Sequence, residues 1–347
     1  MDEALTHPTK MTLPQEMLRQ EFVKITHTGV PDAAWHFEII VHKSTRLGPA
    51  LGKMPVAGGD LVSLALFNRP EPPCDTEIFG LQLAYDIDPA DWLDLWMEAQ
   101  EYTDIVSRKR FAFIGGAIGD VLARWQVDGT RWVGRFFVTK AGARMILHWS
   151  RVAEADYPNL AEPIFFSILS FRMLDDRAGP LAENVRWANG PAPVPWKVAL
   201  PVSWQVIGEP GSAQVGALQA NLVLAASEGA AAPLWGKLSL AIIGLDAAAN
   251  VRKVEEKTLA AVREGAVAME PGAFVVEALE APYTGAWYLR TTGTLNGMAV
   301  AIHGRILRHP QAWVAAVVVG PARQVSPALW MRVKRMLDIA TMTLVMG

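Results

Sequence analysis

The second half of this chain repeats the layout of its first half, although almost no residue is identical. Two pairs of segments carry the repeat: 77–88 with 234–246, and 119–171 with 285–337. In the second pair Gly129 aligns with Gly293. Two tandem copies of one fold explain this layout, and a tandem fold without a reactive group of residues favours a binding surface over a reaction centre.

Length and composition fit two globular domains. The chain has 347 residues, and two domains of about 150 residues each can bury most of their unfolded surface. Hydrophobic residues make up 51% and charged residues 19%, which excludes general disorder. We therefore expect a folded core in each half.

Charge and segment hydropathy exclude several classes of protein. A net charge of −3 offers no global attraction to nucleic acid. The first ten residues lack the cations and the apolar run of a signal peptide, and the longest apolar stretches, such as 313–320, are too short for a membrane span. The lone Cys74 suits a reducing compartment. We predict a cytoplasmic protein with no membrane span and no nucleic-acid partner.

Periodicity predicts an α+β fold in the first half. Residues 1–29 read as an N-terminal extension with a helix at 13–25, and residues 30–176 as the first domain. In that domain we expect strands at 35–42, 60–67, 78–87, 111–114, 119–127, 131–139 and 144–152, and helices at 88–106 and 158–174. Asp88 is the expected cap of the first of these helices, and the Asp128-Gly129 pair indicates a hairpin turn.

The second half follows in the same order of elements. Residues 177–196 are rich in proline and glycine and read as a linker, and residues 197–347 as the second domain. We expect strands at 200–207, 217–226, 236–245, 273–280, 284–293, 297–307 and 312–319, a helix at 246–265, and a final helix capped by Ser326. Each domain is predicted to be an α/β/α sandwich, with a curved antiparallel sheet, a long helix and a C-terminal helix.

No motif in the chain indicates a nucleotide or metal cofactor. Gly236-Lys237 is followed by Leu238 instead of Ser or Thr, so it does not read as a phosphate-binding loop. His36, Glu38 and His42 share a strand face, but His36 and His42 would lie about 20 Å apart at roughly 3.3 Å per residue. We expect a solvated strand face there and no metal.

The remaining polar candidates read as structural. Four carboxylates lie around the start of the helix at 88–106, where the helix dipole favours negative charge: Asp86, Asp88, Asp91 and Asp94. His148 and His303 lie in predicted strands, and Cys74 lies in a proline-rich turn without a sign of activation. We predict no catalytic residue, and the partner-binding residues stay open.

The 13 tryptophans mostly fall where cores are expected: Trp92, Trp96, Trp125, Trp132, Trp149, Trp204 and Trp313. Aromatic residues also dominate grooves that accept a peptide or helix, which is the alternative use. The last helix carries Arg332, Lys334 and Arg335 opposite apolar residues, and we expect a solvated basic face.

The order of elements resembles the PsbP-like and DcrB-like (DUF1795) superfamily. The stretch Leu200-Pro-Val-Ser-Trp204 is similar to that family's opening Pro-x-x-Trp, and Ile168-Leu-Ser-Phe171 is similar to its closing Ser-Phe. The first half lacks a clear Pro-x-x-Trp opening. The resemblance implies a binding protein, and among bacterial cytoplasmic members it points to the Eag-type chaperones of type VI secretion, homodimers whose concave sheets shield apolar helices of an effector.

These observations predict a non-enzymatic adaptor or chaperone with a protein partner, in which one chain supplies the equivalent of such a homodimer. Two alternatives stay open at this point: a small-ligand carrier or enzyme with a pocket between the domains, and a structural subunit of a larger assembly. The sequence also leaves open the partner's identity, the sheet face that binds it, whether the two domains share one groove, and the oligomeric state.

Overall fold

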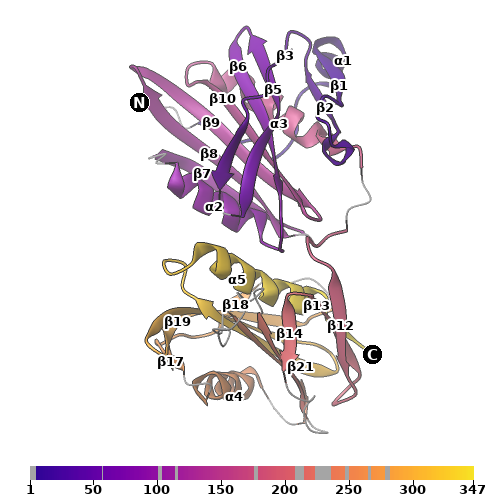
Figure 1. Cartoon of the computed structure of the whole chain (residues 1–347), viewed down its shortest axis with the longest axis vertical. Coiled ribbons are helices and arrows are strands. Elements are labelled where there is room, and N and C mark those ends of the chain that lie inside the picture. Colours follow the sequence, from indigo (N-terminus) through magenta and orange to yellow (C-terminus); the bar gives the residue numbers. More distant parts are fainter. Residues whose placement is uncertain are drawn as a thin grey trace. The chain divides into compact units, whose positions relative to one another are not determined.

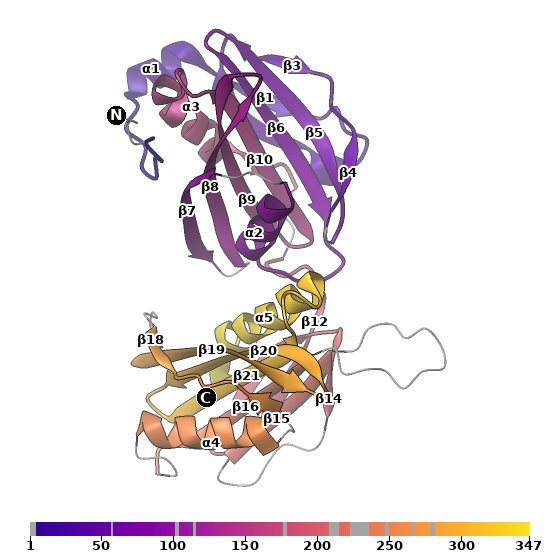
Figure 2. The ribbon, with the colours of Figure 1, turned by 90° about the vertical axis from the view of Figure 1, so that its left-hand side faces the viewer.

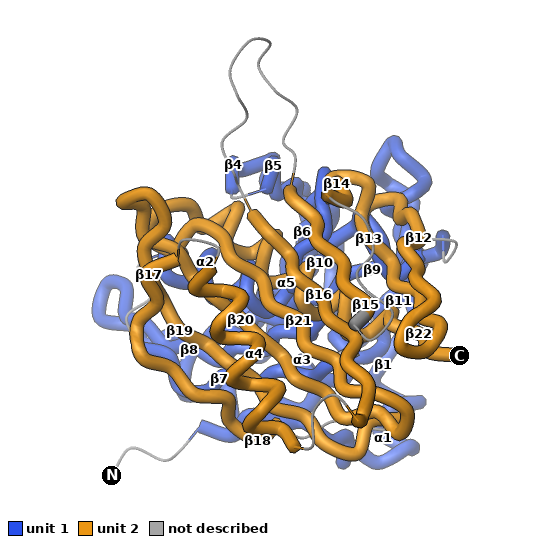
Figure 3. The backbone as a smooth tube through the Cα atoms, turned by 90° about the horizontal axis from the view of Figure 1, so that it is seen from below, with its two compact units in different colours: residues 1–182 blue, residues 183–347 orange. Residues whose placement is uncertain are grey.

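The chain divides into two compact units, residues 1–182 and residues 183–347 (Figures 1 and 3). This computed structural model describes residues 5–56, 58–100, 104–113, 116–175, 179–207, 215–222, 236–246, 250–264, 267–277 and 282–347. Each unit combines a large antiparallel sheet, a small antiparallel sheet and helices. The predicted α+β class with two tandem domains is confirmed.

Unit 1 builds its large sheet in the order β3-β5-β6-β10-β9-β8-β7, with β4 paired to β5, and its small sheet in the order β1-β2-β11. Its elements are α1 (Gln15–Glu21), β1 (Phe22–His27), β2 (Phe37–His42), β3 (Arg46–Gly48), β4 (Lys53–Val56), β5 (Gly59–Pro70), β6 (Pro73–Gln82), α2 (Pro89–Ala99), β7 (Asp104–Phe113), β8 (Gly116–Val127), β9 (Thr130–Ala141), β10 (Arg144–Ala153), α3 (Tyr157–Ser170) and β11 (Arg172–Met173).

Unit 2 has the same order of seven strands in its large sheet, β14-β15-β16-β21-β20-β19-β17, and the same order in its small sheet, β12-β13-β22. The eighth strand of the large sheet differs: β18 pairs with β19 near one edge, whereas β4 of unit 1 pairs with β5 near the other edge. Its elements are β12 (Val185–Gly190), β13 (Trp196–Pro201), β14 (Trp204–Ile207), β15 (Val215–Leu222), β16 (Lys237–Gly244), α4 (Val251–Glu264), β17 (Val267–Met269), β18 (Val275–Glu277), β19 (Gly285–Leu295), β20 (Met298–Arg308), β21 (Ala312–Pro321), α5 (Pro327–Met342) and β22 (Val345–Met346).

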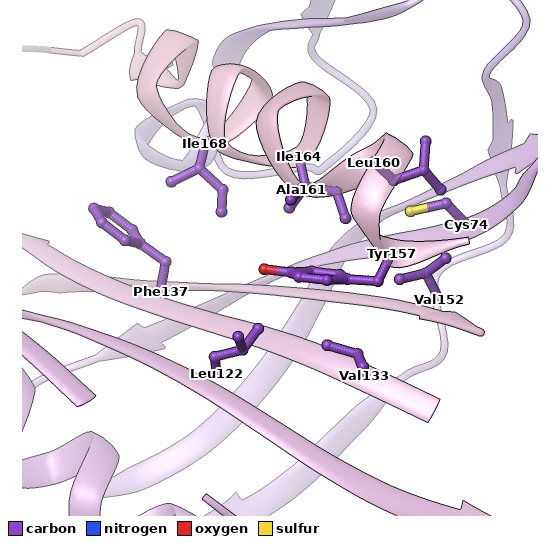
Figure 4. Close-up of a cluster of buried hydrophobic side chains, with 10 residues drawn as sticks. All are labelled: Cys74, Leu122, Val133, Phe137, Val152, Tyr157, Leu160, Ala161, Ile164 and Ile168. Carbon is purple, nitrogen blue, oxygen red and sulfur yellow. The ribbon is translucent and has the colours of Figure 1, made fainter. Parts of the chain in front are cut away.

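Helices cover both faces of each large sheet, which gives the predicted α/β/α layers (Figures 1 and 2). In unit 1, α2 lies on one face, and α3 packs on the other over a cluster that includes Leu122, Val133 and Ile164 (Figure 4). In unit 2, α4 covers one face, where Val262 joins a cluster with Leu289 and Ile302 of the sheet. The helix α5 lies on the opposite face (Figure 1).

Matching turns fix the correspondence between the two copies. Asp128 and Gly129 join β8 to β9 with φ angles of 49° and 80°, and Asn296 and Gly297 join β19 to β20 with 51° and 78°. Both pairs therefore have the left-handed backbone that tight hairpins require. Gly129 corresponds to Gly297, so the predicted alignment of Gly129 with Gly293 is wrong.

Several predicted boundaries differ from the structure. The helix expected at 13–25 ends at Glu21, and the chain continues as β1, which pairs with β2 inside unit 1. The helix expected at 88–106 ends at Ala99, and β7 begins at Asp104. The predicted linker contains β12, which pairs with β13. The predictions for residues 101–103, 114, 223–226, 247–249, 265 and 278–280 lie outside the described residues.

Local sequence explains where the helices begin. Asp88 accepts hydrogen bonds from the backbone N–H groups of Ala90 and Asp91 at 2.9 and 3.1 Å, and Pro89 occupies the first turn of α2. Ser326 caps α5 as predicted, through the N–H of Leu329. Within the described residues, no helix has the length and the hydropathy that crossing a membrane requires.

Candidate functional site

An open apolar groove of about 250 Å³ lies inside unit 2, between α4 and the sheet face formed by β15, β16 and β21. Small and aliphatic side chains dominate its walls, and two lysines and one glutamine are also present. The lining residues are Ala217, Leu218, Gln219, Lys237, Ser239, Leu240, Ala241, Ile243, Lys257, Thr258, Ala261, Val262, Ala315 and Val317.

The floor of the groove is a regular piece of antiparallel sheet. Two rows of laterally paired residues cross its three strands: Ala217–Ala241–Ala315 and Gln219–Ser239–Val317. Because side chains on one strand alternate between faces, both rows point to the α4 side of the sheet. Most of these side chains are short, so they leave space between the sheet and α4.

The corresponding positions of unit 1 hold much larger side chains. Strand pairing matches Ser239, Ala241, Ala315 and Val317 with Glu77, Phe79, Leu147 and Trp149. In unit 1 the Phe79 and Trp149 rings stack at 6.4 Å, and Trp149 meets Trp96 of α2 at 6.2 Å. The same place in the fold is therefore filled in unit 1 and open in unit 2.

The helix α4 forms the other wall of the groove. Its buried residues are Val254, Thr258 and Val262, which face the sheet at helical spacing. The Thr258 hydroxyl donates to the Val254 carbonyl at 2.7 Å, so the polar atom of this wall is satisfied within the helix. Lys257 on α4 and Lys237 at the start of β16 add positive charge beside the apolar floor.

The structure does not bring the metal candidates together. His36 Nε2 lies 2.9 Å from the Val30 carbonyl, and His42 Nδ1 lies 2.7 Å from the Ser44 hydroxyl. Glu38 accepts from Lys24 at 3.0 Å. Among the residues that the structure describes, no group of three or more His, Cys, Asp or Glu side chains is placed to hold a metal ion.

The acidic cluster around α2 is occupied by structural contacts. Asp86 accepts from Lys140 at 2.7 Å. Arg110 lies 2.5 Å from Asp91 and 3.0 Å from Asp94. Besides capping α2, Asp88 accepts from the N–H of Ala117 at 2.8 Å, which ties the helix start to β8.

His148, His303 and Cys74 are buried. Desolvation lowers the pKa of His148 to about 3, and the ring meets Phe171 edge-on at 4.6 Å. Burial raises the pKa of the Cys74 thiol to about 12, which leaves only on the order of one thiolate in 10⁴ at pH 8. His303 Nδ1 lies 2.7 Å from the Tyr288 hydroxyl.

The burial of the tryptophans agrees in part with the prediction that they fill cores, and the exposure of the basic residues of α5 does not agree with its prediction. Trp92, Trp96, Trp204 and Trp313 are buried, whereas the rings at 125, 132 and 149 are half-buried. The predicted solvated basic face of α5 is wrong: the side chain of Arg335 is buried, Arg332 is half-buried with Glu183 4.0 Å away, and Lys334 lies over the Trp330 ring at 5.2 Å.

Sequence reasoning missed the groove because its residues carry no motif. In the sequence Lys237 follows Gly236 in a pair that lacks the Ser or Thr of a phosphate-binding loop, and the alanines have the pattern of ordinary strand positions. The available signal was a comparison of the two copies, in which Phe79 and Trp149 of unit 1 occupy the positions that correspond to Ala241 and Val317 of unit 2. That comparison needs the strand register, which the predicted alignment did not supply.

No protein-family model matches the chain. No curated protein matches it either. Among solved structures, it is similar to the cyanobacterial PsbP of Synechocystis, with 12% identity, a TM-score of 0.34, and coverage of 44% of this chain and 92% of that one. The Ran-binding protein Mog1p of Saccharomyces cerevisiae matches at 9% identity and TM-score 0.33, covering 47% and 95% of the two chains. The apo immunity protein TplEi of the type VI secretion system of Pseudomonas aeruginosa matches at 12% identity and a TM-score of 0.20. This match covers 93% of this chain and 97% of that one. None of these matches assigns the chain to a family.

Proposed function

We propose that the chain is a non-enzymatic protein-binding adaptor or chaperone that holds an apolar segment of its partner in the groove of unit 2. One observation carries this proposal: the groove positions occupied by Phe79, Leu147 and Trp149 in unit 1 are reduced to alanine and valine in unit 2. A fold that can fill this site with its own side chains, and does so in one copy, leaves it open in the other for an external side chain.

The dimensions of the groove favour anchoring by side chains. At about 250 Å³ it is smaller than the roughly 300–1,000 Å³ of typical small-ligand sites, and it suits large apolar side chains projecting from a partner segment. Burial of one such side chain contributes about 1.5–3 kcal/mol. Anchors of this kind dominate the binding energy of many protein interfaces.

The charge beside the groove selects the partner's flanking residues. Lys237 lines the groove, and the lining residues that the structure describes include no carboxylate. An apolar segment with an aspartate or glutamate next to its anchor side chain complements this arrangement. The chaperone form of the proposal, in which the chain shields apolar helices of a secretion-system effector, extends the sequence resemblance to Eag-type chaperones.

The test transfers the filling side chains of unit 1 into unit 2. The double substitution Ala241→Phe and Val317→Trp places at the groove the residues found at the corresponding positions of unit 1. Tagged wild-type and variant chains are used to capture partners from the native cell extract, and captured proteins are identified by mass spectrometry. Ala260→Phe, on the exposed side of α4, is the matched control.

We expect the wild type and the control to recover the same partner, and the double variant to lose it at least tenfold. Lys237→Glu should weaken recovery of a partner with an acidic flank. Equal recovery by the double variant, with unchanged circular dichroism, would contradict the groove as the binding site. A small molecule that native mass spectrometry finds on the wild type but not on the double variant would replace the adaptor function with a ligand carrier.

A further inference from the structure

Unit 1 carries an extended segment of the chain on the α3 side of its sheet. This covering segment, residues 5–10, belongs to no helix or strand. Its Leu5 side chain packs against a hydrophobic cluster of unit 1. Figure 4 shows that cluster, which contains Leu122, Tyr157 and Ile164. The segment therefore occupies a place where α3 and the sheet leave apolar surface uncovered.

Three polar side chains of unit 1 hold the covering segment. Arg135 Nη2 donates to the Pro8 carbonyl at 2.8 Å, and Lys109 Nζ donates to the His7 carbonyl. The His7 ring contacts Asp120, with Nε2 2.9 Å from Oδ1. Two successive backbone carbonyls and one side chain are thus recognised, and only the apolar contact of Leu5 and the contact of His7 depend on the identity of the segment.

The charges beneath the covering segment are not required by the fold. The side chains of Asp120 and Arg135 are fully buried, with Arg135 Nη2 2.6 Å from Asp120 Oδ2. At the corresponding positions unit 2 has Tyr288 and His303, whose side chains form a hydrogen bond of 2.7 Å in place of the ion pair. Burying an ion pair carries a large desolvation cost, so we relate these charges to binding of the segment rather than to stability.

The covering segment does not use all the hydrogen-bonding groups of this site. Arg135 Nη1 and the Tyr157 hydroxyl are buried and have no hydrogen-bond partner among the described residues. Tyr157 is 1% exposed and lies in the same cluster as Leu5. An occupant with one more acceptor group would gain a hydrogen bond that the segment does not make.

The chain between the covering segment and the body of unit 1 has few contacts with it. Residues 10–21 contain no buried side chain, α1 contributes none to the core, and the hydrogen bond from the Thr12 hydroxyl to Glu162 of α3 is exposed to solvent. Few buried contacts mean a low free energy of local opening. The segment can therefore leave its site while β1, which begins at Phe22, keeps its pairing with β2.

We propose that the surface beneath residues 5–10 is a second protein-binding site, which takes an extended segment of a partner protein and is occupied in competition by the chain's own covering segment. The partner segment presents an apolar side chain and, two residues later, a side chain that contacts Asp120, with backbone carbonyls for Lys109 and Arg135. This site belongs to unit 1 and does not depend on the groove of unit 2.

The test measures binding of a fluorescein-labelled peptide that copies residues 5–13 to the full chain, by fluorescence anisotropy. The variant Leu5→Ala with His7→Ala removes the two side-chain contacts of the competing segment. Its matched control is Thr6→Ala with Thr9→Ala, because both threonines are exposed. We expect the first variant to bind the peptide roughly tenfold more tightly than the wild type, since its site is more often empty, and the control to bind like the wild type.

Equal affinity of the wild type and the first variant would overturn the proposal, and so would equal binding of a peptide that carries alanine at the positions of Leu5 and His7. Amide hydrogen exchange of the unaltered chain gives a second test that does not depend on folding of a variant. Saturating peptide should raise exchange in residues 5–10. Unchanged protection with the peptide bound would show that it binds elsewhere.

Discussion

Burial in unit 1 turns one histidine into a source of acid sensitivity. His148 is 1% exposed between Phe137 and Phe171, and desolvation lowers its pKa from 6.5 to about 3. The unfolded chain therefore binds a proton between about pH 6.5 and pH 3 that the folded chain does not. The free energy of unfolding accordingly falls as the pH drops below 6.5 and is insensitive to this group above it.

We expect His148→Phe to reduce this pH dependence. Relative to the variant, the wild type should lose on the order of 1 kcal/mol per pH unit below pH 6.5. Urea unfolding of both proteins at a series of pH values between 5 and 8 measures the difference. Parallel curves for the two proteins would mean that His148 takes up its proton in the folded state.

Single residues also set the limit of sequence reasoning about the groove. The sequence shows that Ala241 and Ala315 lie in strands, but a buried alanine and an alanine that lines an open groove have the same pattern. Their meaning depends on the register that pairs Ala241 with Ala315 and on the distance at which α4 stands. Both are products of tertiary packing, so no motif could reveal them.

At the scale of elements, starts were predicted better than ends. Asp88 and Ser326 cap α2 and α5 as expected, because a capping side chain acts locally. The end of α2 was missed because Tyr102 and Val106 continue its helical spacing, whereas the chain from Asp104 pairs with β8. Long-range strand pairing overrode a local pattern at that point.

The cap of α2 should contribute measurably to stability. Asp88→Ala removes three hydrogen bonds to backbone N–H groups, including that of Ala117 on β8, and we expect a loss of about 2 kcal/mol in the free energy of unfolding. Asp88→Asn, which keeps an acceptor oxygen, should recover part of this loss. Urea unfolding followed by circular dichroism measures both.

Asp60→Ala is the control for the capping variants. Asp60 is exposed and forms an ion pair with Lys53 at 2.8 Å, and surface pairs of this kind contribute at most about 1 kcal/mol. If Asp88→Ala is no more costly than this control, the cap of α2 is not a significant source of stability.

For the molecule as a whole, the repeat in the sequence correctly indicated two copies of one topology. The seven-strand orders of the two large sheets correspond, and so do the small sheets, whereas β4 and β18 lie at opposite edges of their sheets. The first strand of each copy was harder to predict from the sequence. The chain of β1 continues the helical spacing of the preceding residues, and β12 is joined to β13 by the proline-rich residues 191–195. The proline and glycine content of residues 177–196 therefore predicts a linker where β12 lies.

A dissected chain tests this boundary. We expect residues 183–347 to unfold cooperatively on their own, because the sheets and the groove of unit 2 lie within this range. A piece that begins at residue 197 loses β12 and the buried Trp196, and its melting temperature should be lower by roughly 5 °C or more. Equal melting temperatures for the two pieces would show that β12 adds nothing to the stability of unit 2.

The filled site of unit 1 and the open site of unit 2 have a genetic consequence. In an assembly of identical subunits every substitution appears at all equivalent positions, so a mutation that closes one site closes the others too. Here each copy has its own codons, and Trp149 could arise without any change at Val317. Covalent joining thus frees the two halves to drift apart in role while their stoichiometry stays fixed at one to one.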